Sequence, residues 1–162
     1  MTAAPAPDEA ARTAHPDDLD AVAALAVAAA EEKRAQKGGA LWWRRERRQG
    51  DVAAGVRAAL DAADQELAVG TLDGTVIGYA VARSERLTDG GLLGVVDDIY
   101  VDPGARSVGV GEALMDHVLA WCRDQGCFGV DSLALPGDRA TKNFFESFGL
   151  VARAIVVHKP FT

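Results

Sequence analysis

Three residues of this sequence have the types and the spacing of a site for phosphate groups. Arg106, Gly109 and Gly111 form the pattern Arg-x-x-Gly-x-Gly, between an apolar run and an amphipathic one. The free backbone N–H groups and the positive dipole end at the start of a helix attract phosphate. Glycine lacks the Cβ atom that would hold a diphosphate away from the main chain. The pattern predicts a site for a phosphorylated small molecule; the simpler interpretation is a strand-to-helix turn that uses glycine for its φ angles.

Two common phosphate motifs do not fit this loop. Gly104 and Gly109 have the separation found in a Walker loop, but Val110 and Gly111 stand where that motif needs Lys and then Ser or Thr. A nucleotide phosphotransferase is therefore disfavoured. A dinucleotide fingerprint needs a third glycine where Leu114 stands.

Two adjacent carboxylates form a second candidate site. Asp97 and Asp98 interrupt the otherwise apolar run 92–101. A carboxylate in the middle of a strand is unfavourable unless it is solvated or paired. Alternation along a strand places the two on opposite faces, so at least one is expected to face a wet cleft. The alternative is a pair of structural carboxylates that bind backbone groups or an arginine.

Composition limits the classes of function. The chain has 162 residues, 49% of them hydrophobic, which fits one domain with a core. A net charge of −7 and a pI near 4.9 argue against nucleic acid or an anionic membrane as partner and favour a cationic acceptor. The longest apolar run, 21–30, is too short to span a bilayer, and no signal peptide is recognisable, so we expect a cytoplasmic protein. Cys122 and Cys127 are expected to be reduced thiols, and no metal site is predicted.

The elements that must position these residues follow from periodicity and turn signals. We expect a disordered tail at 1–10 and one domain at 11–162. Strands are predicted at 12–15, 66–71, 75–83, 92–101, 129–135 and 152–158, and helices from Pro16 to Gly38, from Asp51, at 110–125 and at 138–148. The segment 41–50, with two tryptophans and four arginines, is read as a solvated helix with one buried tryptophan or as a lid. The order βααβββαβαβ predicts an α/β (α+β) fold: a mixed, mostly antiparallel sheet with helices on both faces.

The loop resembles a motif of the GNAT superfamily of N-acetyltransferases, Val-x-Pro-x-x-[Arg/Gln]-x-x-Gly-x-[Gly/Ala]. Val101, Pro103, Arg106, Gly109 and Gly111 all match it. The resemblance covers about 12–157 and implies the same fold, with the diphosphate of acetyl-CoA held by this loop. The residues it implies for cofactor binding are Ile99, Tyr100 and Val101 through their main chain, and Arg106, Ser107, Val108, Gly109, Val110, Gly111 and Glu112 around the helix start.

A second motif lies at 138–150. Family members often carry Asn-x-x-[Ala/Ser]-x-x-Phe-Tyr-Glu-x-x-Gly-Phe there, of which Phe144, Glu146 and Gly149 match outright. The resemblance places Asn143 and Phe145 at the cofactor. The family's usual Tyr, a proton donor to the leaving thiol, is replaced by Phe145. The proton donor in its place is expected to be Tyr100, Ser147 or a water molecule.

By resemblance, then, the chain is expected to be an N-acetyltransferase. The acetyl group would pass from acetyl-CoA to a small amine or a peptide amine by direct attack in a ternary complex. The Asp-Asp-Ile-Tyr-Val run resembles the acidic pair of polyamine acetyltransferases, which makes Asp97 the first choice for general base, through water, and Asp98 the second. The alternative function is a non-catalytic acyl-CoA-binding or sensing module. A homodimer is common in the family.

Overall fold

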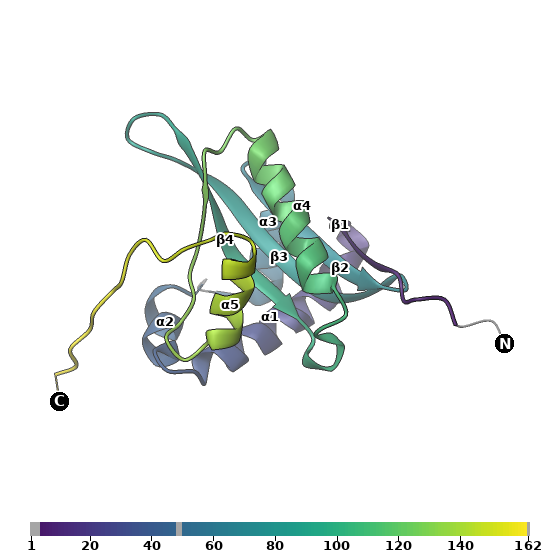
Figure 1. Ribbon diagram of the computed structural model, residues 1–162, viewed down its shortest axis with the longest axis horizontal. Coiled ribbons are helices and arrows are strands. Elements are labelled where there is room, and N and C mark those ends of the chain that lie inside the picture. Colours follow the sequence, from purple (N-terminus) through teal and green to yellow (C-terminus); the bar gives the residue numbers. More distant parts are fainter. Residues whose placement is uncertain (1–3, 48–49, 162) are drawn as a thin grey trace.

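A computed structural model describes residues 4–47 and 50–161 (Figure 1). Its strands are β1 (Glu9–Thr13), β2 (Gln65–Leu72), β3 (Thr75–Arg86), β4 (Leu92–Val101) and β5 (Val130–Ser132). Its helices are α1 (Leu19–Arg34), α2 (Gly39–Arg45), α3 (Val52–Asp61), α4 (Val110–Asp124) and α5 (Arg139–Ser147), with 3-10 turns η1 (Pro16–Asp18) and η2 (Pro103–Ala105). Among the described residues, no helix is long and apolar enough to cross a bilayer.

The five strands form one sheet in the order β1-β2-β3-β4-β5. The first four pair antiparallel, and β5 pairs parallel with β4. Between β2 and β3, Asp73 and Gly74 both adopt positive φ, 48° and 79°. This is the turn geometry that suits the right-handed twist of a hairpin, as the Asp-Gly pair predicts.

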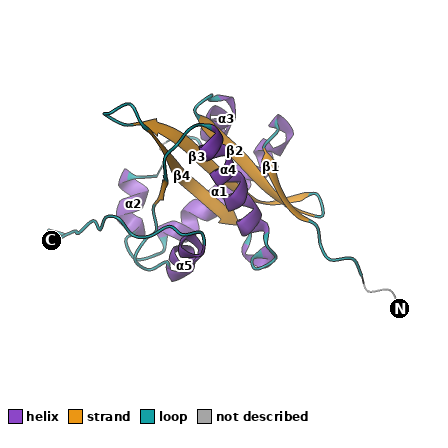
Figure 2. Ribbon diagram, turned by 45° about the horizontal axis from the view of Figure 1, so that its top comes forward, coloured by secondary structure: helices purple, strands orange, loops and turns teal. Residues whose placement is uncertain are grey.

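Helices cover both faces of the sheet, as predicted (Figure 2). One face packs on α4, whose Val110, Leu114 and Val118 are buried against Ala80 and Val96 of the sheet. The other face packs on α1 and α3. Helix α3 begins at the predicted cap, Asp51, whose side chain accepts a hydrogen bond from the Ala54 N–H at 3.2 Å.

Within their paired region, β4 contributes one residue more than β3: residues 92–101 face residues 78–86. Asp98 lies opposite Val81, but Val96 lies opposite Ala82, so Asp97 is the extra residue of a β-bulge. Directly opposite residues share a face of the sheet, and Val81 belongs to the α1 side whereas Ala82 and Val96 belong to the α4 side. The expectation that Asp97 and Asp98 point to opposite faces is therefore wrong, because the bulge resets the alternation.

Strand β5 is shorter than predicted and holds β4 over only part of its length. The pairing runs from Gly94–Val130 to Val96–Ser132. The ladder between β4 and β5 ends at Val96. From Ile99 to Val101, the ladder pairing of β4 is with β3.

The two ends of the chain differ from expectation. Strand β1 begins at Glu9, and Glu9 and Ala10 pair with Leu72 and Thr71, so the sheet extends into the range 1–10 expected to be a tail. The predicted last strand, 152–158, is absent from the described structure: 151–161 has no helix or strand and every residue in it is exposed. A strand requires backbone pairing with a neighbour, and no described strand pairs with this segment.

Candidate active site

A cleft of about 990 Å³ lies over the α1 side of β3 and β4, between α1, α2, α3 and α5. This size suits a small-molecule site. The predicted site residues that line it are Asp97, Asp98, Ile99, Tyr100, Val101, Arg106, Ser107, Gly111, Glu112 and Phe145. Four predicted residues do not: Val108, Gly109, Val110 and Asn143. Val110 is a core side chain, 1% exposed, and Asn143 is exposed on α5.

The loop that leads into α4 leaves the start of that helix open. Gly109 is its N-cap residue with φ 91°, and no side chain caps the free N–H groups of the first turn. A Cβ atom at Gly109 would also meet Glu9 Cγ at 3.2 Å. Ser107 takes a positive φ of 70°, which few non-glycine residues adopt. The loop thus has the backbone form of an anion site, which is the fit that a diphosphate requires.

Arg106 joins this loop to helix α1. Its Nε donates to the Val101 carbonyl at 3.0 Å, and its Nη2 donates to Glu32 Oε2 at 2.8 Å. Its guanidinium also lies over the Tyr100 ring, 5.3 Å from the centroid. The side chain therefore connects the loop that precedes α4 to the end of β4 and to α1.

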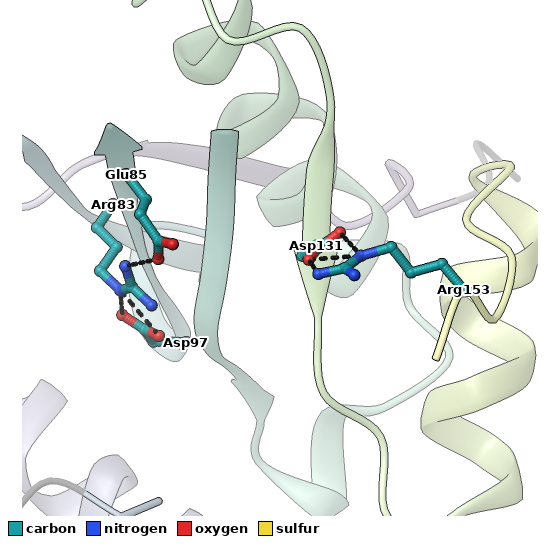
Figure 3. A network of polar contacts seen from close by, with 5 residues as sticks. All are labelled: Arg83, Glu85, Asp97, Asp131 and Arg153. Carbon is teal, nitrogen blue, oxygen red and sulfur yellow. Dashed lines mark hydrogen bonds and ion pairs between the residues drawn. The ribbon is translucent and has the colours of Figure 1, made fainter. Parts of the chain in front are cut away.

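The bulge brings both predicted carboxylates to the cleft. Asp97 accepts from Arg83 Nε at 3.1 Å, and Arg83 Nη1 also donates to Glu85 at 2.6 Å (Figure 3). Asp98 lies on the same side and acts electrostatically on Lys33 of α1. One carboxylate is thus bound to an arginine, as the structural alternative expected, while the two together make one wall of the cleft acidic.

Lys33 is a cleft residue that the sequence analysis missed. Burial lowers its pKa, against the opposing effects of Asp98, Asp138 and Asp97. Its Nζ lies 4.8 Å from the centroid of the Trp42 ring. A signal was present: Lys33 continues the apolar stripe of α1, seven residues after Ala26 and four after Ala29.

Among the described residues that line the cleft, acidic side chains outnumber basic ones. The acidic ones are Glu32, Glu46, Asp51, Asp97, Asp98, Glu112 and Asp138, and the basic ones are Lys33, Arg47, Arg83 and Arg106. Asp138 also caps α5, accepting from the Thr141 N–H at 3.0 Å. The cleft therefore favours a cationic ligand at its acidic wall.

Phe145 and the two hydroxyl residues expected from the sequence, Ser147 and Tyr100, can be compared for proton donation. Phe145 lines the cleft and is 6% exposed, but it carries no proton to give. Ser147 is outside the cleft and donates to the Phe144 carbonyl at 2.6 Å. Tyr100 lines the cleft, and burial together with Glu32 raises its pKa, which keeps its hydroxyl protonated at neutral pH. Tyr79, 1% exposed, also reaches the cleft from β3 and was not predicted.

The tryptophan- and arginine-rich segment forms a wall of the cleft. Trp42 in α2 is buried, and Trp42, Glu46 and Arg47 line the cleft. The guanidinium carbon of Arg47 lies 4.1 Å from the centroid of the Trp43 ring. The helix with one buried tryptophan is thus found over 39–45; Arg48, part of the predicted segment, lies outside the described residues.

Comparison with solved structures shows the same fold. An aminoglycoside N-acetyltransferase AAC(6')-Iy in complex with CoA has a TM-score of 0.75 at 18% identity, over 99% of each chain. A mutant of the BH1408 protein from Bacillus halodurans has a TM-score of 0.79 at 16% identity, over 94% of this chain and 99% of that one. An aminoglycoside acetyltransferase, meta-AAC0020, from an uncultured soil metagenomic sample in complex with sisomicin has a TM-score of 0.68 at 18% identity, over 95% of both.

The sequence itself matches a known family. No curated protein matches it. The sequence profile of the Acetyltransferase (GNAT) family, however, matches residues 32–150, which include the cleft walls, the bulge and the loop before α4. The chain therefore belongs to the GNAT family of acetyltransferases.

Proposed function

We propose that this protein is an N-acetyltransferase that moves the acetyl group of acetyl-CoA to a cationic primary amine, within a ternary complex. One observation carries the proposal: the acidic pair at the bulge and the open start of α4 border one cleft. Two structural neighbours are aminoglycoside acetyltransferases, one in complex with CoA and one in complex with sisomicin. They support CoA as the cosubstrate and an amine as the acceptor. A cytoplasmic location and a homodimer belong to the same proposal.

The cosubstrate fits two features of the backbone. The uncapped N–H groups of Val110, Gly111 and Glu112 would hold the diphosphate, with Arg106 shaping the loop around it. The ladder between β4 and β5 ends at Val96, so main-chain groups of Ile99 and Tyr100 would pair with the amide groups of the pantetheine arm, as an added strand does. Main-chain groups at Ile99, Tyr100 and Val101 are then the candidates to stabilise the oxyanion of the thioester.

The transfer itself requires a neutral amine. An ammonium group with a pKa of about 10.4 is mostly charged at neutral pH, so it binds the acidic wall as a cation and must lose a proton before attack. We assign that proton to Asp98, directly or through water, because its pairing opposite Val81 places it on the cleft side of β4. The amine nitrogen then attacks the thioester carbonyl and the C–N bond forms. The nitrogen gives its second proton to water as the C–S bond breaks and the thiolate leaves. Tyr100 would protonate the thiolate and regain its own proton from solvent.

The test is a screen of acceptors with acetyl-CoA, followed by release of free thiol. The panel holds polyamines, aminoglycosides including sisomicin, lysine-containing and N-terminal peptides, and neutral or anionic amines of similar size. We expect turnover with di- or polycationic amines and much less with the anionic ones. Turnover confined to anionic amines would refute the acceptor class.

The absence of a tyrosine at Phe145 favours a second candidate, a non-catalytic acyl-CoA-binding module. Calorimetry with CoA separates the two. Binding of CoA with no thiol release from any acceptor supports the sensing module, whereas absence of CoA binding refutes both.

A further inference from the structure

The chain carries a primary amine inside its own candidate active site. Its sequence contains four lysines, Lys33, Lys37, Lys142 and Lys159, and all four lie in the described part of the chain. Lys33 lines the cleft, whereas the other three are exposed and do not line it. A primary amine is the group that the proposed reaction acetylates. Lys33 is therefore a candidate acceptor supplied by the protein itself.

The Lys33 amine is held against an aromatic wall of the cleft. Its Nζ lies 4.8 Å from the centroid of the Trp42 ring, and Trp42 is only 8% exposed, so the ring is a fixed surface. An aromatic face attracts a cation without accepting a directed hydrogen bond from one particular proton. Among the described residues, Lys33 forms no hydrogen bond or ion pair. No described carboxylate therefore holds the amine in its charged form at close range.

The surroundings of Lys33 favour loss of its proton. Burial lowers its pKa, and the opposing electrostatic effect of the nearby carboxylates, of which Asp98 has the largest, is too weak to restore the usual value. Only the neutral amine has the lone pair that attacks a carbonyl carbon. A partly desolvated lysine is therefore a better nucleophile at neutral pH than a lysine surrounded by water.

Lys33 also shares the part of the cleft where the acetyl group is expected. Asp98, the proposed general base, acts electrostatically on Lys33 from β4. The next two residues of β4, Ile99 and Tyr100, line the same cleft, and their main-chain groups are the candidates to hold the thioester. The Lys33 amine thus lies beside the carboxylate that is proposed to receive the acceptor's proton.

We propose that Lys33 is a site of self-acetylation, which accepts the acetyl group of acetyl-CoA bound in the same cleft. The inference rests on the proposed function, because the cleft must first hold acetyl-CoA. The neutral Lys33 nitrogen attacks the thioester carbonyl, a C–N bond forms, the C–S bond breaks, and CoA leaves as its thiolate. The nitrogen gives one proton to water. The product is an amide, so the reaction removes the positive charge of Lys33 from the cleft.

Incubation of the full-length protein with acetyl-CoA and no added amine tests the inference, with tandem mass spectrometry to locate the acetyl groups. We expect Lys33 to be acetylated at least tenfold faster than Lys37, because a positioned amine meets the bound thioester within one complex. Lys37, exposed and four residues away, reports uncatalysed acetylation. Excess CoA, which carries no acetyl group, should slow the reaction of Lys33 and leave that of Lys37 unchanged. Equal rates at the two lysines, or no effect of CoA, overturn the inference.

Two arginine variants and a dilution series make the test independent of those rates. Lys33→Arg keeps a positive charge but removes the amine, so this variant should gain one acetyl group fewer per chain than the wild type. Lys37→Arg is the matched control and should keep the fast acetylation of Lys33. The fraction of Lys33 acetylated at a given time should not depend on protein concentration. Equal acetylation of the two variants, or a rate that rises with protein concentration, contradicts reaction within one copy.

Calorimetry with CoA and the acceptor screen separate this inference from the proposed function. Turnover of an added amine while Lys33 stays unmodified would overturn self-acetylation and leave the proposed function standing. Acetylated Lys33 without turnover of any added amine would support self-acetylation and contradict transfer to an external acceptor. Absence of CoA binding would overturn both.

Discussion

Arg83 and Asp97 form an ion pair between neighbouring strands, with 3.1 Å between Arg83 Nε and Asp97 Oδ2. Asp97 is the extra residue of the bulge, and its two oxygens are oriented by this arginine. Asp98, the next residue, lies opposite Val81 and acts on Lys33 more strongly than Asp97 does. Two adjacent carboxylates in one cleft therefore have different surroundings, and we expect them to have different roles.

Replacement of each carboxylate by its amide should separate those roles. Asp98→Asn should lower kcat by roughly 10²–10⁴-fold, the usual contribution of a positioned base. Asp97→Asn should mainly raise the acceptor KM, with kcat within about tenfold of wild type. The loss in Asp98→Asn should shrink as pH rises towards the amine pKa of about 10.4, because more acceptor is already neutral. Initial rates of thiol release, measured for each variant as a function of acceptor concentration and pH, check these changes in kcat and KM.

The control for that pair is Asp20→Asn, an exposed carboxylate of α1 outside the cleft, which should leave kcat and KM unchanged. A larger fall in kcat from Asp97→Asn than from Asp98→Asn would reverse our assignment of the base.

Alanine at Gly109 should weaken CoA binding. Its φ of 91° disfavours any side chain by about 1–2 kcal/mol, and the new Cβ would press on Glu9. Gly126→Ala is a matched control at the other end of α4, with φ 82° and open space around it. We expect both variants to lose similar stability, measured as Tm, but only Gly109→Ala to raise the Kd for CoA, by tenfold or more in calorimetry. Equal CoA affinities in the two variants would remove the loop from the cosubstrate site.

The proton donor can be tested by exchanging two side chains. Tyr100→Phe should lower kcat tenfold or more, and Phe145→Tyr should raise it if a hydroxyl there reaches the leaving sulfur. Because the pKa of Tyr100 is raised, the wild type should not lose activity by its ionisation below about pH 10. Phe148→Tyr, outside the cleft, is the control. If Tyr100→Phe retains wild-type kcat, the donor is a water or another group.

Lys33 should oppose the binding of a cationic acceptor. Lys33→Met removes the positive charge that faces Asp98 and keeps an unbranched side chain beside Trp42. We expect the KM of a polyamine to fall by about fivefold to tenfold, equivalent to about 1–1.4 kcal/mol. The KM of a neutral amine should stay the same. An equal change for both amines would show that Lys33 acts through the shape of the cleft and not through its charge.

The same lysine predicts how stability changes with pH. Since burial lowers its pKa in the folded chain, the unfolded chain binds the proton more tightly. Between the folded pKa and about 10.4, Lys33 therefore makes the free energy of unfolding increase as pH rises. Urea unfolding at several alkaline pH values should show this increase in wild type relative to Lys33→Met. A constant difference between the two proteins would mean that the Lys33 pKa is normal.

Local sequence signals predicted the positions of helices and strands better than they predicted which strands pair. Periodicity located β4 at 92–101, and the Asp73-Gly74 and Asp51 signals correctly marked a hairpin and a helix start. These features depend on residues close in sequence. The segment 152–158 has an equally good strand pattern, but pairing depends on a neighbour that no local pattern specifies.

The candidate site was predicted only where it depends on local sequence. The loop motif correctly located the start of α4, and the two carboxylates were recognisable because they interrupt an apolar strand. Which way they face depends on the register between β3 and β4, and the bulge is a property of two strands. Lys33 and Tyr79 enter the cleft through tertiary packing. The helical spacing of Lys33 shows only that it lies on the packed face of α1, and Tyr79 looks like an ordinary strand residue in the sequence alone.

The bulge also has a consequence for how this cleft can change during evolution. A strand that lacked Asp97 would pair with β3 without interruption, with Val96 and Ile99 still towards α4 and Asp98 and Tyr100 still towards the cleft. Asp97 is in that sense an inserted residue that shifts the pairing of β3 and β4 at one position only. Related sequences can therefore gain, lose or exchange one charged group in this wall of the cleft through a change at a single codon, and the packing of the two cores stays as it is.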